Sequence, residues 1–429
     1  MVNFERVKSL RGVIEVPADK SITHRAIFFS SMAIGESIIY NPLKSEDTLA
    51  TISIMQKLGI DISIEEEKII VYSHGYKSFV EPDNVLDCKN SGTTTRLLFG
   101  LLSPQKKYFV ITGDDSLRKR PVDRVIIPLT TLGAKIFARM GNRLLPSTIM
   151  QAQMCSGKVV QTVASAQVKS AIILSGIQIE GEVIYEEKIA TRNHSELLAP
   201  AYGVDIRSEK GNIIVKGGKD LRKYNFTIPG DFSSAAFYLA AALIFENSLI
   251  TIKNVGLNST RTGFLNILKI MGAKIHIDYK RSDLEPVGDI SIENSLLNGV
   301  RVDGEIIPNI IDELPLVATL GLICSDFVEV RDAKELRVKE SDRIKALAYN
   351  IRALGGRFDE YEDGFRVYPL VREKYDKDIY LKSFSDHRIA MINILLAKKF
   401  GDRVFVDDIS SINVSNPEYL SILMKLEER

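Results

Sequence analysis

Short clusters of hydroxylated and charged residues stand at six places along this chain, each directly before a run rich in alanine, isoleucine or leucine. The clusters are Lys20–Arg25, Asn90–Arg96, Ser165–Lys169, Asp231–Ser234, Asp312–Pro315 and Ser385–Arg388. Ser, Thr and Asp cap helix N-termini, and the unpaired N–H groups of such an end attract phosphate or carboxylate. A lysine or arginine beside the end strengthens the attraction. The pattern therefore predicts a protein that binds anions at several helix starts.

The densest group of ionisable residues is Glu335–Arg343, which begins a further amphipathic helix. Ser341 or Glu340 is the expected N-cap of that helix. A self-paired, solvent-exposed helix start is the simpler interpretation of the spacing alone. However, Asp312 and Arg388 lie at two of the six clusters, and corresponding ends of repeated units tend to converge. We therefore expect a site where a bound anion exchanges a proton.

The elements that must position these residues also recur. An amphipathic helix that ends in a glycine-led step into a strand follows most of the clusters, at Lys57–Ile62, Thr131–Ile136, Ala201–Ile206, Ile270–Ile275 and Ala353–Phe358. Glycine suits the left-handed conformation that closes a helix. The repeating unit is thus strand, helix, strand, helix and further strands, with a period of about 70 residues, longer than in ordinary solenoid repeats. The last helix, 417–426, has no strand after it, and we expect Arg11–Val16 to supply one.

Two of the clusters share a Pro-small-Asp pattern, in Val16–Ser21 and Ile228–Ser233. Proline ends a strand and stiffens a short connection. We interpret these segments as two crossings between domains, near 16–21 and 228–233. One α/β domain would then comprise residues 1–19 and 230–429 with both termini, and the inserted one residues 20–229. A cleft between two such domains is a usual place for a ligand.

Composition narrows the class of protein. The 429 residues are 45% hydrophobic, and 56 Lys and Arg against 55 Asp and Glu give a net charge of +1. Such a balance provides no general attraction for nucleic acid or acidic membranes. The three cysteines, Cys88, Cys155 and Cys324, are isolated, and there is no secretion signal or long apolar run, so we expect a cytoplasmic protein. The five histidines are scattered and no metal-binding or P-loop motif is present, so we expect no metal and no cofactor.

The chemical residues resemble those of the enolpyruvyl transferase family, and within it the 5-enolpyruvylshikimate-3-phosphate synthases. The resemblance runs from Val16 to Tyr419 in seven motifs that follow the family order. They are Asp19–Arg25, Asn90–Leu98, Asp115–Pro121, Ser165–Ser170, Ile311–Pro315, Glu335–Ile344 and Asp386–Met391. Any one motif is weak, but seven in order are specific.

The resemblance implies a fold and a reaction. The fold is an inside-out α/β barrel in each of two globular domains, each built from three βαβαββ units, with the active site in the interdomain cleft. The reaction transfers the enolpyruvyl group of phosphoenolpyruvate to the 5-hydroxyl of shikimate 3-phosphate and releases phosphate, in the shikimate pathway that leads to chorismate and the aromatic amino acids. It proceeds by addition and elimination through a tetrahedral intermediate. The partners are thus two small molecules, and we expect a monomer.

The resemblance also assigns roles to positions of this chain. Shikimate 3-phosphate would be held by Lys20, Ser21, Arg25, Ser165, Gln167, Arg192, Asp312 and Lys339. Phosphoenolpyruvate would be held by Lys20, Gly92, Arg120, Arg343 and Arg388. The catalytic group would comprise Asp312, which accepts the 5-hydroxyl proton, Glu340, which with Lys339 exchanges protons with the methylene carbon, and Lys20. Arginine suits both ligands because its planar fork pairs two oxygens of a phosphate or carboxylate. Gly92 lacks the methyl group that crowds glyphosate in insensitive members, so we expect this inhibitor to act.

Four positions depart from the family pattern. Ala18 replaces a usual glycine, Val414 stands where many members have a lysine, Glu335 is asparagine in some members, and Thr191 begins a loose match to a Ser-Arg-Asp-His motif. We assign no substrate contact to Val414, Glu335 or Thr191.

Two other functions remain as alternatives. The first is enolpyruvyl transfer to UDP-N-acetylglucosamine, whose enzymes usually carry a cysteine in the loop that is Gly113–Pro121 here; this loop has none. The second is a non-catalytic protein that binds phosphate or RNA ends. That function calls for a basic face with interleaved aromatic residues, and the chain has no Trp and a net charge of only +1.

Overall fold

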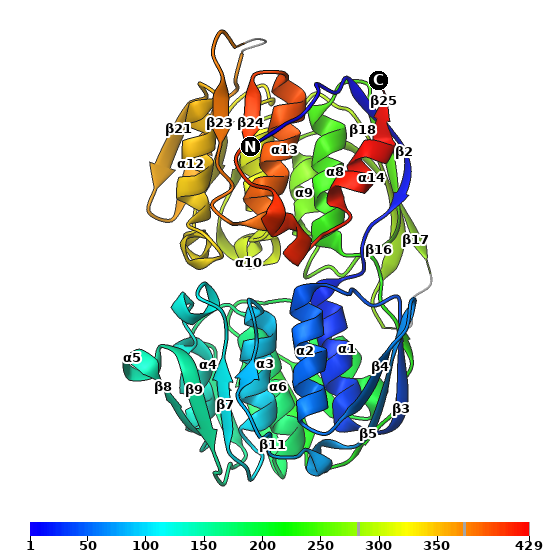
Figure 1. The fold of residues 1–429 in the computed structure, drawn as a ribbon, viewed down its shortest axis with the longest axis vertical. Coiled ribbons are helices and arrows are strands. Elements are labelled where there is room, and N and C mark those ends of the chain that lie inside the picture. Colours follow the sequence, from blue (N-terminus) through cyan, green and yellow to red (C-terminus); the bar gives the residue numbers. More distant parts are fainter. Residues whose placement is uncertain (281–283, 372–374, 429) are drawn as a thin grey trace. The chain divides into compact units, whose positions relative to one another are not determined.

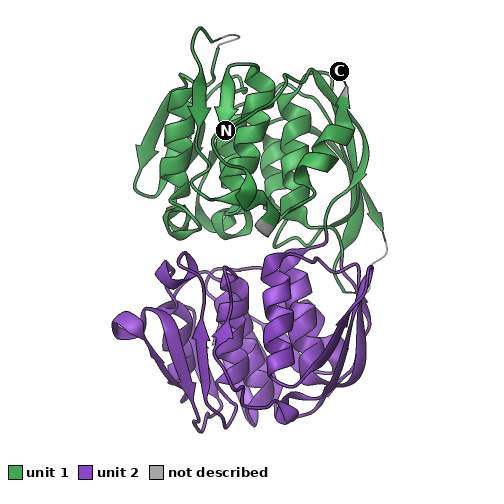
Figure 2. Cartoon of the chain, viewed as in Figure 1, with its two compact units in different colours: residues 1–17, 229–429 green, residues 18–228 purple. Residues whose placement is uncertain are grey.

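The computed structural model describes residues 1–280, 284–371 and 375–428. The chain forms two compact units (Figure 2). Unit 1 comprises Met1–Pro17 and Pro229–Arg429, and unit 2 comprises Ala18–Ile228. The chain therefore passes between the units twice, once before Ala18 and once after Ile228.

A βαβαββ unit is complete in three of the sheets. In each, the first two strands are parallel and the last two form an antiparallel pair, so that the spatial order is first, second, fourth, third. The first comprises β6 (Leu86–Asp87), α3 (Gly92–Leu102), β7 (Phe109–Thr112), α4 (Asp123–Thr131), β8 (Lys135–Ala138) and β9 (Leu144–Met150). The second comprises β10 (Gly157–Val160), α6 (Ala166–Gln178), β11 (Gly181–Glu186), α7 (His194–Leu198), β12 (Asp205–Glu209) and β13 (Asn212–Gly217). The third comprises β19 (Val300–Val302), α11 (Leu314–Leu320), β20 (Val328–Val330), α12 (Arg343–Ala353), β21 (Phe358–Tyr361) and β22 (Gly364–Val367).

The other three sheets borrow strands from distant parts of the chain. The first comprises α1 (Lys20–Met32), β3 (Ala33–Tyr40), α2 (Glu46–Lys57), β4 (Asp61–Ile64) and β5 (Lys68–His74), with β14 (Leu221–Arg222) and β15 (Phe226–Thr227) parallel to β3. The second comprises α8 (Phe232–Ile244), β16 (Leu249–Gly256), α9 (Gly263–Ile270), β17 (Lys274–Lys280) and β18 (Val287–Glu293), with β2 (Ser9–Glu15) parallel to β16. The third comprises β23 (Ile379–Leu381), α13 (His387–Phe400), β24 (Val404–Val406) and α14 (Tyr419–Leu426), with β1 (Val2–Asn3) antiparallel to β24.

The N-terminal strand lies beside the end of the last helix, but it belongs to another sheet than expected. We predicted that Arg11–Val16 would complete the unit of the last helix. Instead, β2 lies between β16, in the sheet of α8, and β25 (Glu427–Glu428), the short strand that directly follows α14. The reason is the crossing between the units. The strand β15 directly precedes α8 in sequence, but it pairs with β3 in unit 2. The sheet of α8 therefore lacks its own first strand, and β2 takes that position beside β16. The last unit is instead completed by the two residues of β1.

The predicted helix starts are confirmed, since helices begin at Lys20, Gly92, Ala166, Phe232, Leu314 and His387. Five have a side-chain cap, namely Asp19, Ser91, Ser165, Asp231 and Asp386, each of which accepts a hydrogen bond from an N–H of the first turn. The predicted glycine closures are also confirmed, because Gly59, Gly133, Gly203, Gly272 and Gly355 all have a positive φ. That conformation costs an L-residue energy and costs glycine little.

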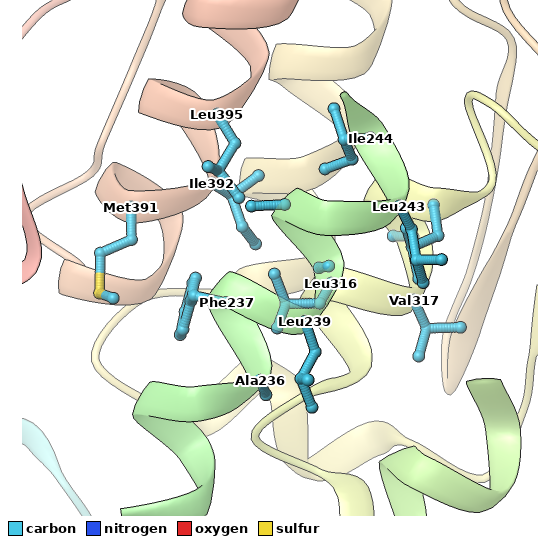
Figure 3. Packing of buried hydrophobic residues seen from close by; sticks show 14 of the residues in the cluster. Ala236, Phe237, Leu239, Leu243, Ile244, Leu316, Val317, Met391, Ile392 and Leu395 are labelled. Atoms are coloured by element: carbon cyan, nitrogen blue, oxygen red, sulfur yellow. The ribbon is translucent and has the colours of Figure 1, made fainter. Parts of the chain in front are cut away.

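Helices form the interior of each unit and sheets its outer layers (Figure 1). Every residue of α8 except Ser234 is buried, as are most of α1, α6 and α13, whereas strands such as β3 alternate between buried and exposed residues. Helices that are apolar on all sides belong in a core. Figure 3 shows the packing in unit 1, where Phe237 and Leu239 of α8 lie among side chains of α11 and α13. The inside-out α/β barrel is therefore confirmed.

Among the helices that the structure describes, none has the length and apolar character needed to cross a membrane.

Candidate active site

The ionisable residues of unit 1 gather around one buried arginine. Arg343, the first residue of α12, has a side chain that is only 1% exposed. Its Nε donates to Asp386 at 2.9 Å, one Nη donates to Glu340 at 2.6 Å, and the other lies 3.5 Å from a carboxylate oxygen of Asp312. Burial lowers the pKa of Arg343, but these carboxylates outweigh burial and hold its pKa above the usual range. The guanidinium is therefore a permanent cation.

The start of α12 differs from the prediction. The N-cap is Asp342, which accepts from the N–H of Lys345 at 3.1 Å, and neither Ser341 nor Glu340 fills that place. The Ser341 hydroxyl instead donates to Asp386 at 3.0 Å, and Glu340 binds Arg343. The aspartate is the better cap because its carboxylate can reach the N–H two to three residues on while the neighbouring side chains satisfy the cluster.

Asp386 is a fully buried carboxylate that serves two elements. It caps α13 by accepting from the N–H of Arg388 at 3.0 Å, and it accepts from Arg343 of α12. Burial raises the pKa of Asp386, but the charge of Arg343, its hydrogen bond and the nearby His387 together lower it further, so the net shift is downward. An ionised Asp386 therefore connects the starts of α12 and α13.

A second buried carboxylate, Glu313, holds Arg388. The Nη1 of Arg388 donates to the backbone carbonyl of Asp312 at 2.9 Å and lies 3.6 Å from Glu313. Glu313, which is 0% exposed, also accepts from both the hydroxyl of Ser233 at 2.5 Å and the guanidinium of Arg261 at 3.2 Å. Each buried charge thus has an opposite charge and neutral donors around it, as buried charges require.

Lys339 and Glu340 lie just before α12. Lys339 is half-buried, and burial lowers its pKa while the carboxylate of Asp312 partly opposes that shift. A lysine with a lowered pKa can lose its proton nearer neutral pH, as proton exchange requires. Glu335, one of the positions that depart from the family, is half-buried in the preceding turn. Its charge also raises the pKa of Lys339, but less than that of Asp312 does.

Unit 1 therefore brings together all five of its predicted site residues, Asp312, Lys339, Glu340, Arg343 and Arg388, in one constellation of alternating charges. The sequence analysis gave no individual role to four residues that support the constellation, namely Glu313, Arg261, Ser233 and Asp386. The signal for three of them was present, because Ser233, Glu313 and Asp386 fall inside the helix-start clusters. Nothing in the local sequence singles out Arg261. The side chain of Val414 lies outside the described residues.

In unit 2, Lys20 begins α1. Its ammonium lies 3.0 Å from Asp47 of α2, and the two side chains are 24% and 12% exposed. Asp19 caps the helix by accepting from the N–H of Ile22 at 2.8 Å. The salt bridge orients the Lys20 side chain toward α2, a helix that contains none of the sequence motifs.

Arg25, one turn further along α1, is buried and donates to three neutral oxygens. Its partners are the hydroxyl of Ser195 at 2.9 Å, the hydroxyl of Ser170 at 2.8 Å and the backbone carbonyl of Ser21 at 2.9 Å. Arg25 thus joins the start of α1 to α6 and to the start of α7. Of the other predicted groups, Ser165 caps α6, and Arg192 is half-buried in the segment just before α7.

Gly92 is the first residue of α3 and lies near two arginines. A Cβ at this position would lie 2.9 Å from Nη1 of Arg96 and 3.6 Å from Nη1 of Arg120. Arg120 donates to the Asn90 side chain at 2.7 Å, and Arg96 donates to Gln167 of α6 at 2.6 Å. Gly92 therefore lies near Arg120, and Arg96 connects this place to Gln167. Arg96 was not among the predicted site residues, although it lies in the Asn90–Arg96 cluster.

A buried histidine connects the same helices. His24 of α1 shares a hydrogen bond of 2.8 Å with Thr51 of α2, whose hydroxyl meets Thr94 at 2.7 Å, and Thr94 in turn donates to Ser91, the cap of α3, at 2.6 Å. Burial lowers the pKa of His24 from 6.5 to about 3. The imidazole is therefore neutral at neutral pH, and the chain of hydrogen bonds fixes α1 and α3 without adding charge.

No three His, Cys, Asp or Glu residues in the described parts of the chain gather closely enough to hold a metal ion.

The sequence profile of the family described as EPSP synthase (3-phosphoshikimate 1-carboxyvinyltransferase) matches residues 4–423. A 3-phosphoshikimate 1-carboxyvinyltransferase of Petrotoga mobilis is 44% identical over 424 residues, which cover 98% of each chain. The Bacillus subtilis protein of the same name is 37% identical over 426 residues, 99% of each chain.

Solved structures agree with these matches. An EPSP synthase from Acinetobacter baumannii superimposes with a TM-score of 0.86 at 33% identity, covering 99% of this chain and 97% of that one. The enolpyruvyl transferase NikO from Streptomyces tendae has a TM-score of 0.80 at 14% identity over 99% of this chain and 96% of its own, which shows the shared fold alone.

Proposed function

The chain belongs to the EPSP synthase family, and we propose that it transfers the enolpyruvyl group of phosphoenolpyruvate to the 5-hydroxyl of shikimate 3-phosphate and releases phosphate. This reaction belongs to the shikimate pathway of aromatic amino-acid biosynthesis. The observation that carries the proposal beyond family membership is the constellation around Arg343, because it holds carboxylates and permanent cations within contact of one another. A reaction that moves protons next to anionic substrates needs both.

In the addition step, a C–O bond forms between the 5-oxygen of shikimate 3-phosphate and C2 of phosphoenolpyruvate. Asp312 takes the hydroxyl proton, and Glu340, with Lys339, delivers a proton to the methylene carbon. The neighbouring guanidiniums of Arg343 and Arg388, 3.5 and 4.0 Å from Asp312, favour its ionised form, which suits a base.

In the elimination step, Glu340 takes a proton back from the methyl carbon, the C2–O bond to phosphate breaks, and the enol ether remains on the 5-oxygen. The hydroxyl proton held by Asp312 leaves with the phosphate, which restores the carboxylate. Lys20 supports the departing phosphate as a cation. The lowered pKa of Lys339 supports its part in the proton exchange, since its neutral form is reached at a lower pH than for an exposed lysine.

We assign phosphoenolpyruvate to Arg343 and Arg388 of unit 1 and to Arg120, Lys20 and the backbone of Gly92 in unit 2. Shikimate 3-phosphate is assigned to Ser21, Arg25, Ser165, Gln167 and Arg192 with Lys20, Asp312 and Lys339. Guanidinium forks match carboxylate and phosphate oxygens in pairs, and each charged contact contributes about 1.5 to 3 kcal/mol. The support for these assignments is that each unit gathers its own members around helix starts.

A release assay tests the function. Purified protein is incubated with phosphoenolpyruvate and either shikimate 3-phosphate or UDP-N-acetylglucosamine, without added metal, and free phosphate is measured. We expect release with shikimate 3-phosphate only. Release with the sugar nucleotide would leave the fold and change the substrate, and no release with either acceptor would favour a phosphate- or RNA-end-binding protein.

We also propose that the protein works as a monomer in the cytoplasm. The support for the location is its three cysteines, which are free and isolated as in proteins of reducing compartments. Light scattering after gel filtration tests the monomer, for which the expected mass is that of one chain, 47.9 kDa. A mass of about twice that value, near 96 kDa, would indicate a dimer and contradict the proposal.

A further inference from the structure

We propose that Lys169 is a positioning residue that fixes the segment 187–196, and with it Arg192, for binding the phosphate of shikimate 3-phosphate. This inference rests on the proposed function. Lys169 takes no part in the proposed chemistry, yet it is one of the largest fully buried side chains of the protein.

The ammonium of Lys169 is completely used by one segment of chain. It lies 2.7 Å from a carboxylate oxygen of Glu196 and 2.9 Å from one of Glu187, and it donates to the backbone carbonyl of Thr191 at 3.1 Å. The Lys169 side chain is 1% exposed, and those of Glu187 and Glu196 are 11% and 10% exposed. Three donors thus meet three acceptors spaced across ten residues of chain, so one side chain determines the path of the whole segment.

The segment also folds onto itself at Glu187. That carboxylate accepts from the backbone N–H of Thr191 at 2.9 Å and from its hydroxyl at 2.6 Å. Lys169 and Glu187 therefore hold Thr191 from two sides, and Arg192 is the next residue. These contacts fix the backbone directly before Arg192.

The backbone of Lys169 belongs to α6, the helix whose start carries residues assigned to shikimate 3-phosphate. Lys169 lies in the first turns of α6, after Ser165 and Gln167 and directly before Ser170. Ser170 binds both Arg25 and Ser195, so α6, α1 and the segment share one network. The position of Arg192 relative to Ser165, Gln167 and Arg25 is thus set through Lys169.

Charge gives a second reason for a lysine at this place. Without it, the carboxylates of Glu187 and Glu196 would remain buried beside a site proposed for a dianionic phosphate. Burial already raises the pKa of Glu196 despite the nearby ammonium. Removing the lysine should therefore both release the segment and repel the phosphate.

The test compares kinetic constants of Lys169→Met, Arg192→Ala and the double variant, with Lys158→Met as control. Lys158 forms an exposed ion pair with Glu186, next to Glu187 in sequence, so its loss reports a mere change of surface charge. We expect Lys169→Met to raise KM for shikimate 3-phosphate at least tenfold and to leave KM for phosphoenolpyruvate within twofold. The double variant should have a KM for shikimate 3-phosphate no higher than that of the weaker-binding single variant, because both substitutions remove the same contact, that of Arg192 with the phosphate.

An unchanged KM for shikimate 3-phosphate, a parallel rise for both substrates, or additive effects in the double variant would overturn the proposal. If Lys169→Met does not fold, Glu187→Gln keeps the shape of the side chain and removes its charge, and a rise of about threefold in the same KM is expected. An unchanged KM in that variant would likewise overturn it. Inactivity of the unaltered protein would refute the proposed function instead, so the two failures are distinguishable.

Discussion

The two units hold their arginines in different ways. In unit 1, Arg343 and Arg261 bind carboxylates directly, and each of these pairs is buried. In unit 2, Arg25 donates to two serine hydroxyls and a backbone carbonyl, and Arg120 donates to the side chain of Asn90. A neutral oxygen positions a guanidinium without cancelling its charge, whereas a carboxylate does both.

The difference separates two tasks. Unit 1 places carboxylates and cations together, as proton transfer requires, and its charges are part of its own stability. In unit 2, hydroxyl and amide groups direct the guanidiniums of Arg25 and Arg120, as a site for anionic ligands requires, whereas the ammonium of Lys20 pairs with Asp47. The comparison predicts that equivalent substitutions damage stability in unit 1 and ligand binding in unit 2.

The largest effect is expected from Arg343→Met. It leaves Asp386 and Glu340 without their cation, and Asp386 is fully buried, so the free energy of unfolding should fall by about 3 to 5 kcal/mol and activity should be lost. Denaturant unfolding measures the change, with Arg343→Lys as the charge-conserving control. A variant as stable as the parent would show that the ion pairs of Arg343 do not stabilise unit 1.

Arg120→Ala and Lys20→Met should give the opposite pattern. Both cations belong to unit 2, and we expect kcat to fall by about 10²- to 10³-fold because each is proposed to bind a substrate group on which charge develops. The free energy of unfolding should change by less than about 1 kcal/mol, since both side chains are partly exposed. Circular dichroism melts alongside the kinetics decide this, and a large loss of stability would mean that these cations belong to the core.

Gly92→Ala tests whether the start of α3 in unit 2 contacts glyphosate. Glyphosate should inhibit the unaltered protein in competition with phosphoenolpyruvate, and the added methyl group, 2.9 Å from Nη1 of Arg96, must displace that flexible side chain. We expect inhibition to weaken about tenfold or more. Inhibition constants for both proteins measure it, and equal constants would show that the start of α3 does not contact the inhibitor.

An effect on stability below neutral pH alone concerns His24, whose pKa is lowered from 6.5 to about 3 by burial. Below pH 6.5 the unfolded chain takes up a proton that the folded chain refuses, so stability is lost as the pH falls from 6.5 toward 3. His24→Asn keeps a polar group near Thr51 and should flatten this dependence by about 1.4 kcal/mol per pH unit. Parallel slopes for variant and parent between pH 6 and 4 would show that His24 is protonated in the fold.

Local sequence predicted the elements and the helix starts well, because the residues that cap and close helices act on their neighbours. Asp19, Ser91 and Ser165 cap the helices that follow them, and Gly203 ends a helix in the left-handed conformation. The full-length match to the EPSP synthase family confirmed the resemblance that the motifs indicated.

Long-range pairing was harder to predict. The strand β2 joins β16 across more than 230 residues, and its pairing depends on which strand the crossing removes. Arg261 binds Glu313 from 52 residues away, and Asp47 binds Lys20 from 27 residues away, with no local pattern to mark either. The roles of the substrate-binding residues stay predictions, since they concern contacts with ligands.

The proposed mechanism requires that Glu340 and Asp312 transfer protons, while unit 2 provides most of the groups that bind shikimate 3-phosphate. Glu340→Gln, compared with Arg25→Ala, tests it through two readouts: calorimetric affinity for shikimate 3-phosphate, and deuterium uptake at the methylene carbon of phosphoenolpyruvate in heavy water. We predict that Glu340→Gln binds shikimate 3-phosphate like the parent but takes up no deuterium, and that Arg25→Ala loses affinity. Deuterium uptake by Glu340→Gln at the parent's rate would contradict the account.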